Sequence, residues 1–181
     1  MQLIQRFNTL TSNLNYSNEK IIYPFLMLSV LFTACKKDDD CDFTETTKVA
    51  TAAEKQYIED FLADTNLVAV AHPSGIYYNI LQNGNGTKPN VCSYISVKYK
   101  GTYFDGTVFD QTEDDDVASF YLGELIGGWH KGVPLIGEGG KIRLYIPPTL
   151  GYGPDGVVYQ GVQMIPPNAY LIFDIELLDI Q

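Results

Sequence analysis

The chain has 181 residues, of which 45% are hydrophobic, 19% charged and 13% aromatic, a composition typical of a globular protein. Twelve Lys and Arg against 22 Asp and Glu give a formal charge of −10, and no basic cluster indicates a phosphate-binding surface, so nucleic acid is not expected as a partner. Three cysteines and two histidines are too scattered for a zinc site, and no glycine-rich nucleotide motif is present, so neither a metal nor a cofactor is expected.

The N-terminal part of the chain carries an apolar run that is typical of a signal peptide. Residues 21–34 are almost entirely apolar, but the run is shorter than the roughly 20 residues that a membrane-spanning helix needs. A buried core helix is the alternative interpretation. The preceding Lys20 and the small residues that end the run favour export. The sequence therefore predicts a signal peptide over residues 1–34.

The apolar run ends at Cys35, directly after Thr33 and Ala34. Small residues before a cysteine at this place resemble the lipobox of bacterial lipoproteins, in which the signal is cleaved before the cysteine and the cysteine is lipidated. The resemblance implies lipidation of Cys35 and attachment to a bacterial membrane, expected to be the outer membrane, through acyl chains alone. Residues 35–50 are polar and are expected to form a flexible tether.

Residues 51–64 are predicted to form a helix. Tyr57 and Phe61 are spaced by one helical turn, and Thr51 with Glu54 three positions later forms a capping-box pattern. The helix is expected to pack on the side of the following domain, although a docking or dimerisation helix is the alternative.

Short segments rich in β-forming residues follow from residue 75 onward. Residues 75–81 end at a turn, and Asp105-Gly106 between β-forming residues predicts a hairpin. In residues 171–178 every second side chain is apolar, so one face of that strand is expected to be buried. Residues 128–135 can form one short helix. The sequence thus predicts an α+β domain, a largely antiparallel sheet with one short helix covering its apolar face.

The isolated polar residues do not indicate a nucleophile, a general base or a metal site. His72 and His130 are expected to be structural or solvated, and the acidic run 113–116 lacks the spacing of an EF-hand loop, so a solvated loop is favoured over a calcium site. Cys41 and Cys92 could pair in an oxidising compartment. Cys41 lies in the predicted tether, however, so the unpaired state is favoured.

Six short motifs in residues 75–181 resemble a known family in their order and spacing. They are VKYKG at 97–101, VFD at 108–110, FYLG at 120–123, LIGGW at 125–129, LGYG at 150–153 and IPPNA at 165–169. Together they resemble the FKBP-type peptidyl-prolyl cis-trans isomerases. The resemblance implies an FKBP-like antiparallel half-barrel wrapped around a short helix, and an enzyme that accelerates rotation about Xaa-Pro bonds.

The resemblance also implies a site. Its catalytic residues would be Phe109, Asp110, Trp129 and Tyr152, and its substrate-binding residues Tyr99, Phe120, Leu125, Ile126, Ile165 and Phe173. Trp129 is expected at the floor of a proline pocket, where an apolar environment would favour the twisted, less dipolar amide and so lower a rotation barrier of about 18–20 kcal/mol. A chaperone module that binds peptides in the same groove with little turnover is the alternative.

The expected organisation is a signal peptide over 1–34, a tether over 35–50, a helix and linker over 51–74 and an isomerase domain over 75–181. The implied partners are proline-containing polypeptides among exported or surface proteins, and macrolides that inhibit the family. A monomer is expected, because the predicted helix is shorter than the dimerisation helices of many bacterial relatives. The apolar-rich segment 154–163 after Tyr152 is hypothesised to influence substrate preference.

Overall fold

The computed structural model describes residues 41–113 and 116–181. The predicted signal peptide over 1–34 and Cys35 lie outside the described residues. The helices and 3-10 turns of the described residues are α1 (Ala52–Asp64), η1 (Leu122–Glu124), α2 (Gly127–Gly132), η2 (Val133–Leu135) and η3 (Pro148–Leu150). The strands are β1 (Val70–Ala71), β2 (Tyr77–Gln82), β3 (Tyr94–Tyr103), β4 (Val108–Gln111), β5 (Ala118–Tyr121), β6 (Lys141–Ile146), β7 (Val157–Tyr159), β8 (Val162–Ile165) and β9 (Leu171–Ile180). In this part of the chain, no helix is long and apolar enough to cross a membrane.

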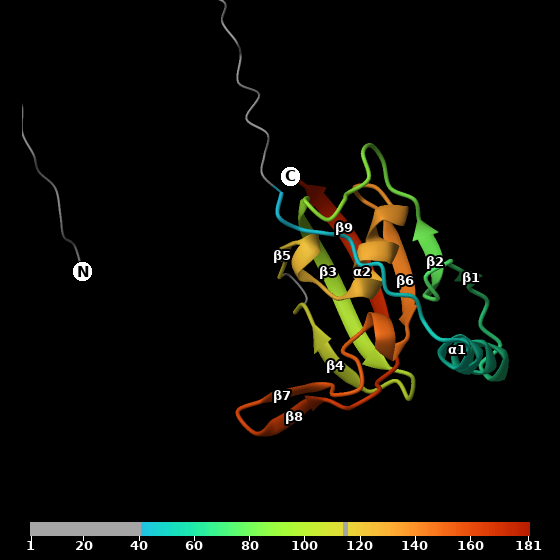
Figure 1. The fold of residues 1–181 in the computed structure, drawn as a ribbon. Coiled ribbons are helices and arrows are strands. Elements are labelled where there is room, and N and C mark those ends of the chain that lie inside the picture. The colour runs from blue at the N-terminus through green and yellow to red at the C-terminus, as the bar shows by residue number, and fades with distance from the viewer. Residues whose placement is uncertain (1–40, 114–115) are drawn as a thin grey trace, which may run out of the picture. The chain divides into compact units, whose positions relative to one another are not determined.

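Seven of the nine strands of the described residues form one sheet in the order β1-β2-β6-β9-β3-β4, with β5 also paired to β3. All of these pairings are antiparallel, and the two ends of the order do not pair with each other, so the sheet is open and not a closed barrel. The β7–β8 hairpin is a separate two-stranded unit that projects from the sheet (Figure 1). The predicted α+β fold with an antiparallel sheet is confirmed.

The short helix α2 lies on one face of the sheet, as the sequence predicts, and its glycines let it approach closely. A Cβ atom added to Gly128 would lie 2.5 Å from a side-chain carbon of Ile146, and one added to Gly132 would lie 2.5 Å from Leu144. Both neighbours are fully buried in β6, so neither has room to move aside. The glycines therefore set how close α2 sits to the sheet, and with it the position of Trp129.

The side chains of strand β9 alternate between the two faces of the sheet. Its alternate residues Leu171, Phe173, Ile175 and Leu177 are buried in the core beneath α2, as the period-two pattern predicts. Asp174 and Glu176 point to the opposite, outer face. We call the face that carries α2 the concave face.

Helix α1 covers part of the outer face. Its N-terminus has the predicted capping box between Thr51 and Glu54. Ile58 and Leu62 pack with Tyr77 and Tyr145 in a second apolar cluster. Tyr145 alternates with core residues along β6 and so belongs to the outer face, yet it is 0% exposed because α1 lies over it. The helix thus packs on the side of the domain, as expected.

Residues 41–50 differ from the flexible tether expected for them. They run past α2 to the start of α1 (Figure 1), and we call this segment the strap. Cys41 is joined to Cys92 by a disulfide, with Cα atoms 5.6 Å apart. The expectation that these cysteines stay unpaired is therefore wrong. The fold places Cys41 beside Cys92, just before β3, although the two residues are 51 positions apart in the sequence.

Three further contacts hold the strap to the end of β5 and to α2. The Phe43 ring packs on Tyr121 with centroids 5.6 Å apart. Glu45 forms an ion pair of 2.6 Å with Lys131, and the Thr46 amide donates to Nδ1 of His130 at 3.4 Å. His130 is 7% exposed and has a structural position, as expected. The strap is thus packed along the element that carries Trp129.

Candidate functional site

A hollow of about 270 Å3 opens on the concave face. It is lined by Tyr99, Asp110, Phe120, Glu124, Leu125, Ile126, Trp129, Tyr152 and Phe173. These side chains come from strands β3, β4, β5 and β9, from η1 and α2, and from the loop after η3. Segments far apart in sequence meet there because the sheet curves around α2.

Trp129 and Phe173 are the most deeply buried aromatic residues of this hollow, at 4% and 3% exposed. The Trp129 ring is edge-on to Tyr99, with centroids 5.7 Å apart and planes at 80°, and edge-on to Phe173, at 5.3 Å and 83°. Edge-to-face packing of this kind favours one orientation of each ring. The three rings therefore form a rigid apolar surface.

Asp110 and Tyr99 form the polar edge of the hollow. The Tyr99 hydroxyl donates to Oδ2 of Asp110 at 2.7 Å. Burial, and then the Asp110 carboxylate, raise the pKa of Tyr99 well above its usual range. Tyr99 is therefore a stable donor at any physiological pH, and it fixes the Asp110 side chain at the edge.

Two hydrogen-bond donors of the hollow are unused within the described part of the chain. The Tyr152 hydroxyl has no hydrogen-bond partner there, and neither does the Ile126 amide. Burial, followed by the charges of Asp110 and Tyr103, raises the pKa of Tyr152, so its hydroxyl keeps its proton. Backbone and phenol donors without internal partners can serve a carbonyl-bearing ligand.

The structure brings eight of the ten residues named from the sequence to this hollow. Phe109 lies behind its wall, edge-on to Phe173 at 5.5 Å and 87°. A Cβ atom at Gly101 would come within 2.7 Å of Phe109 and 3.0 Å of Phe173, so the glycine of the first motif is what lets these rings meet. Ile165 is buried in β8 and is not part of the lining.

Glu124 lines the hollow but was not predicted. It is the last residue of η1 and lies directly before Leu125 and Ile126. As the charged residue between two of the motifs it could have been noticed, but the sequence alone does not show that η1 turns it toward the hollow.

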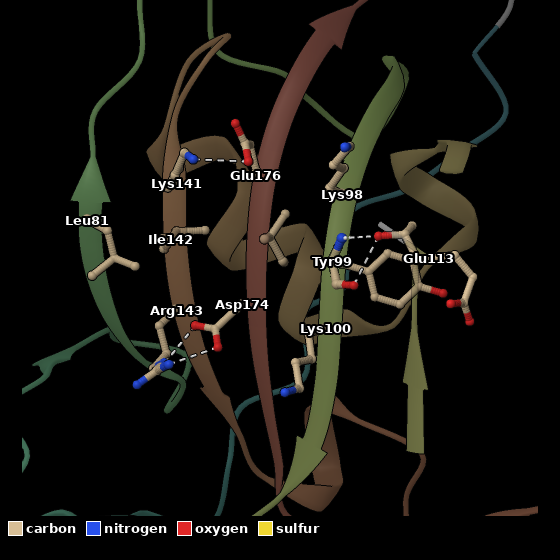
Figure 2. A pocket seen from close by; sticks show the side chains of 12 residues that line it. Leu81, Lys98, Tyr99, Lys100, Glu113, Lys141, Ile142, Arg143, Asp174 and Glu176 are labelled. Atoms are coloured by element: carbon tan, nitrogen blue, oxygen red, sulfur yellow. Dashed lines mark hydrogen bonds and ion pairs between the residues drawn. The ribbon is translucent and has the colours of Figure 1, made fainter. Parts of the chain in front are cut away.

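A second hollow, of about 400 Å3, lies on the outer face of the sheet and has a different character (Figure 2). Lys141 of β6 forms an ion pair with Glu176 of β9 at 3.0 Å. Arg143 of β6 donates two hydrogen bonds, of 2.7 and 2.8 Å, to the carboxylate of Asp174. Basic residues of β6 and β3 thus flank the acidic residues of β9. This is a cross-strand ion-pair ladder, whose opposite charges stabilise the sheet modestly, and it offers no continuous basic surface.

No cluster of metal-ligating side chains occurs within residues 41–113 and 116–181. The acidic run 113–116 falls partly on residues 114–115, which the structure does not describe.

An antiparallel sheet around a short helix, with an aromatic hollow between them, defines the class as an α+β domain with a concave site of ligand size. The comparison with protein families narrows this class, since the model described as FKBP-type peptidyl-prolyl cis-trans isomerase matches residues 85–178. The chain therefore belongs to the FKBP-type peptidyl-prolyl cis-trans isomerase family.

Individual relatives agree with this assignment. The isomerase FkpA of Escherichia coli is 39% identical over 131 residues, which are 72% of this chain and 46% of the relative. The outer membrane protein MIP of Legionella longbeachae is 38% identical over 113 residues, 62% of this chain and 47% of the relative. The solved structure of a peptidyl-prolyl cis-trans isomerase from Pseudomonas syringae is similar with a TM-score of 0.60 and 30% identity, covering 75% of this chain and 99% of that chain. The chain spans about half the length of the first two relatives.

Proposed function

We propose that this protein is a peptidyl-prolyl cis-trans isomerase that acts on proline-containing polypeptides. The observation that supports this most strongly is the aromatic hollow above Trp129, with two donors, the Tyr152 hydroxyl and the Ile126 amide, that have no partner within the described residues. An apolar floor suits a proline ring, and the donors suit the carbonyl groups on either side of it.

The proposed mechanism needs no nucleophile. Rotation about the Xaa-Pro bond removes amide resonance and makes the carbonyl less dipolar, so transfer into an apolar hollow costs the twisted form less than the planar form. The walls exclude water from the rotating bond, while Tyr152 and Ile126 hold the flanking carbonyls in place. Asp110, fixed by Tyr99, faces the amide. Binding that is stronger for the twisted form than for the ground state lowers the barrier.

Turnover by the purified protein tests this function. We expect faster cis–trans exchange of a short Xaa-Pro peptide, a loss of this catalysis when a macrolide ligand of the family is added, and weaker catalysis in Tyr152→Phe and Trp129→Ala. Loss of one hydrogen bond to the substrate is expected to cost roughly tenfold in kcat/KM for Tyr152→Phe. Macrolide binding without any turnover would support the chaperone alternative instead.

The β7–β8 hairpin is proposed to contact substrate residues next to the proline. Val158, Tyr159, Val162 and Met164 are each between 54% and 64% exposed, and the Tyr103 hydroxyl, which donates to the Met164 carbonyl at 3.2 Å, links the hairpin to β3. If a Gly/Ser loop in place of residues 157–164 left the ranking of residues before proline unchanged, this role would be excluded.

Export and lipid anchoring are proposed from separate observations. A disulfide between Cys41 and Cys92 favours an oxidising compartment, and one relative is named as an outer membrane protein. The lipobox-like sequence before Cys35 supports lipidation. Incorporation of labelled fatty acid into the protein, and its loss in Cys35→Ala, is the expected result. Equal labelling of both proteins would contradict the anchor.

A further inference from the structure

Glu54 joins α1 to the loop that carries Tyr152, although α1 lies outside the family-matched residues 85–178. Its Oε1 atom accepts the Thr149 amide at 2.8 Å, and its Oε2 atom accepts the Thr149 hydroxyl at 2.9 Å. The same carboxylate also accepts the Thr51 amide at 2.8 Å, which completes the capping box. One side chain therefore ties the start of α1 to the middle of η3.

Thr149 is separated from Tyr152 by two residues with little freedom. Leu150 is almost fully buried in the core. The Gly151 amide donates to the Pro147 carbonyl at 3.0 Å, and the Gly153 amide donates to the Pro148 carbonyl at 2.9 Å. A displacement of Thr149 is thus transmitted through a closed turn to Tyr152.

The bond between Glu54 and Thr149 is charge-assisted, the stronger kind of hydrogen bond. Burial acts to raise the pKa of Glu54, but hydrogen bonds from Thr51 and Thr149 together lower it below its usual value. The carboxylate is therefore ionised at neutral pH, and both of its oxygens act as acceptors. A glutamine has one acceptor oxygen and cannot satisfy both threonines in this way.

We propose that Glu54 is a positioning residue for catalysis: through Thr149 it holds the η3 turn so that the Tyr152 hydroxyl keeps its place at the edge of the aromatic hollow. This inference rests on the proposed isomerase function. It means that α1, which lies outside the family-matched residues 85–178, helps to position a side chain of the site.

A matched pair of variants at Thr149 tests the proposal in the full-length protein. Thr149→Ser keeps the hydroxyl that donates to Glu54, whereas Thr149→Val removes it at nearly the same volume. We expect Thr149→Val and Glu54→Gln to lower kcat about tenfold with a smaller change in KM, because a misplaced Tyr152 affects the twisted amide more than the bound ground state. Thr149→Ser should stay within about twofold of the parent.

A destabilised control separates positioning from simple loss of stability. Ile58→Val weakens the packing of α1 at a buried site without touching Thr149, and it should lower the Tm while leaving kcat unchanged. Equal kcat values for Thr149→Val, Thr149→Ser and the parent would overturn the proposal. So would a loss in Ile58→Val as large as that in Thr149→Val.

Amide exchange at Gly153 provides a readout that does not depend on turnover. We expect exchange at this amide to be about tenfold faster in Thr149→Val and Glu54→Gln than in the parent and in Ile58→Val. An inactive parent that shows this pattern would refute the proposed function and still support the link from Glu54 to the Tyr152 loop. An active parent with unchanged exchange in the variants would refute the link alone.

Discussion

Tyr99 contributes to the candidate site both as an apolar ring and as a polar group. Its ring stands edge-on to Trp129, and its hydroxyl donates to Asp110. The family resemblance implied that Tyr99 binds substrate, but it did not predict the hydrogen bond to Asp110. A carboxylate at the rim of an apolar hollow needs such a donor, because an unrestrained charged side chain would turn toward water.

Replacing Tyr99 with phenylalanine is expected to separate these two contributions. The ring contacts with Trp129 remain in Tyr99→Phe, while Asp110 loses its donor. We expect kcat/KM for a proline peptide to fall roughly tenfold, the effect of one hydrogen bond to a charged group, with little change in macrolide affinity. Tyr103→Phe, which loses a hydroxyl bonded to the Met164 carbonyl, is the matched control. Equal losses in the two variants would contradict a specific role for the Tyr99 hydroxyl.

At the scale of elements, the strap and α2 depend on a neutral histidine. The Thr46 amide donates to Nδ1 of His130, so this nitrogen must be without a proton. The pKa of His130 is lowered, chiefly by burial and to a smaller extent by the charge of Lys131. The backbone carbonyls of Gly123 and Leu125 and the charge of Glu45 act in the opposite direction but do not outweigh burial. Protonation of His130 would thus remove this hydrogen bond between the strap and α2.

The sign of the pH dependence follows from this lowered pKa. A group whose pKa is lower in the folded than in the unfolded protein contributes stability above its unfolded pKa of about 6.5, and this stability is lost as the pH falls through the folded value. We expect the free energy of unfolding to fall more steeply from pH 7 toward pH 5 in the parent than in His130→Phe. Denaturant titrations across this range measure it.

The comparison should be made in a His72→Gln background, because burial also lowers the pKa of His72. Parallel pH profiles for the two proteins would show that His130 is not the group responsible.

At the scale of the whole molecule, the disulfide makes the strap part of the domain. It joins two cysteines that are 51 positions apart in the sequence, and the loop that it closes includes α1, β1 and β2. Loop closure of this length restricts the unfolded chain and is worth about 4 kcal/mol through the chain entropy that it removes. Without the disulfide the strap would rely on the Phe43 ring contact, the Thr46–His130 hydrogen bond and a partly exposed ion pair, and such an ion pair contributes little.

Removing this bond should therefore lower stability measurably. We expect Cys41→Ser to reduce the free energy of unfolding by about 2–4 kcal/mol, as measured by denaturant unfolding without reductant. Cys92→Ser and the double variant should lose the same amount, because all three remove one and the same bond. Additive losses, or no loss, would show that the disulfide does not restrain the chain in this way.

The sequence by itself determined those features that depend on neighbours along the chain. Alternation in residues 171–178 predicted the buried face of β9, Thr51 and Glu54 predicted the start of α1, and Asp105-Gly106 predicted the turn between β3 and β4, where Gly106 has a positive φ of 85°. The motifs also identified the family and most of the residues that line the aromatic hollow. Such patterns are readable because helix and strand periodicity involve residues that are close in sequence.

The tertiary structure alone decided which distant residues meet. It paired Cys41 with Cys92, laid the strap along α2, covered Tyr145 with α1 and brought Glu54 to Thr149, 95 positions away in the sequence. Each of these contacts depends on how the sheet curves and on which of its faces a helix covers. These properties arise from the packing of the whole core, and no local pattern of residues encodes them.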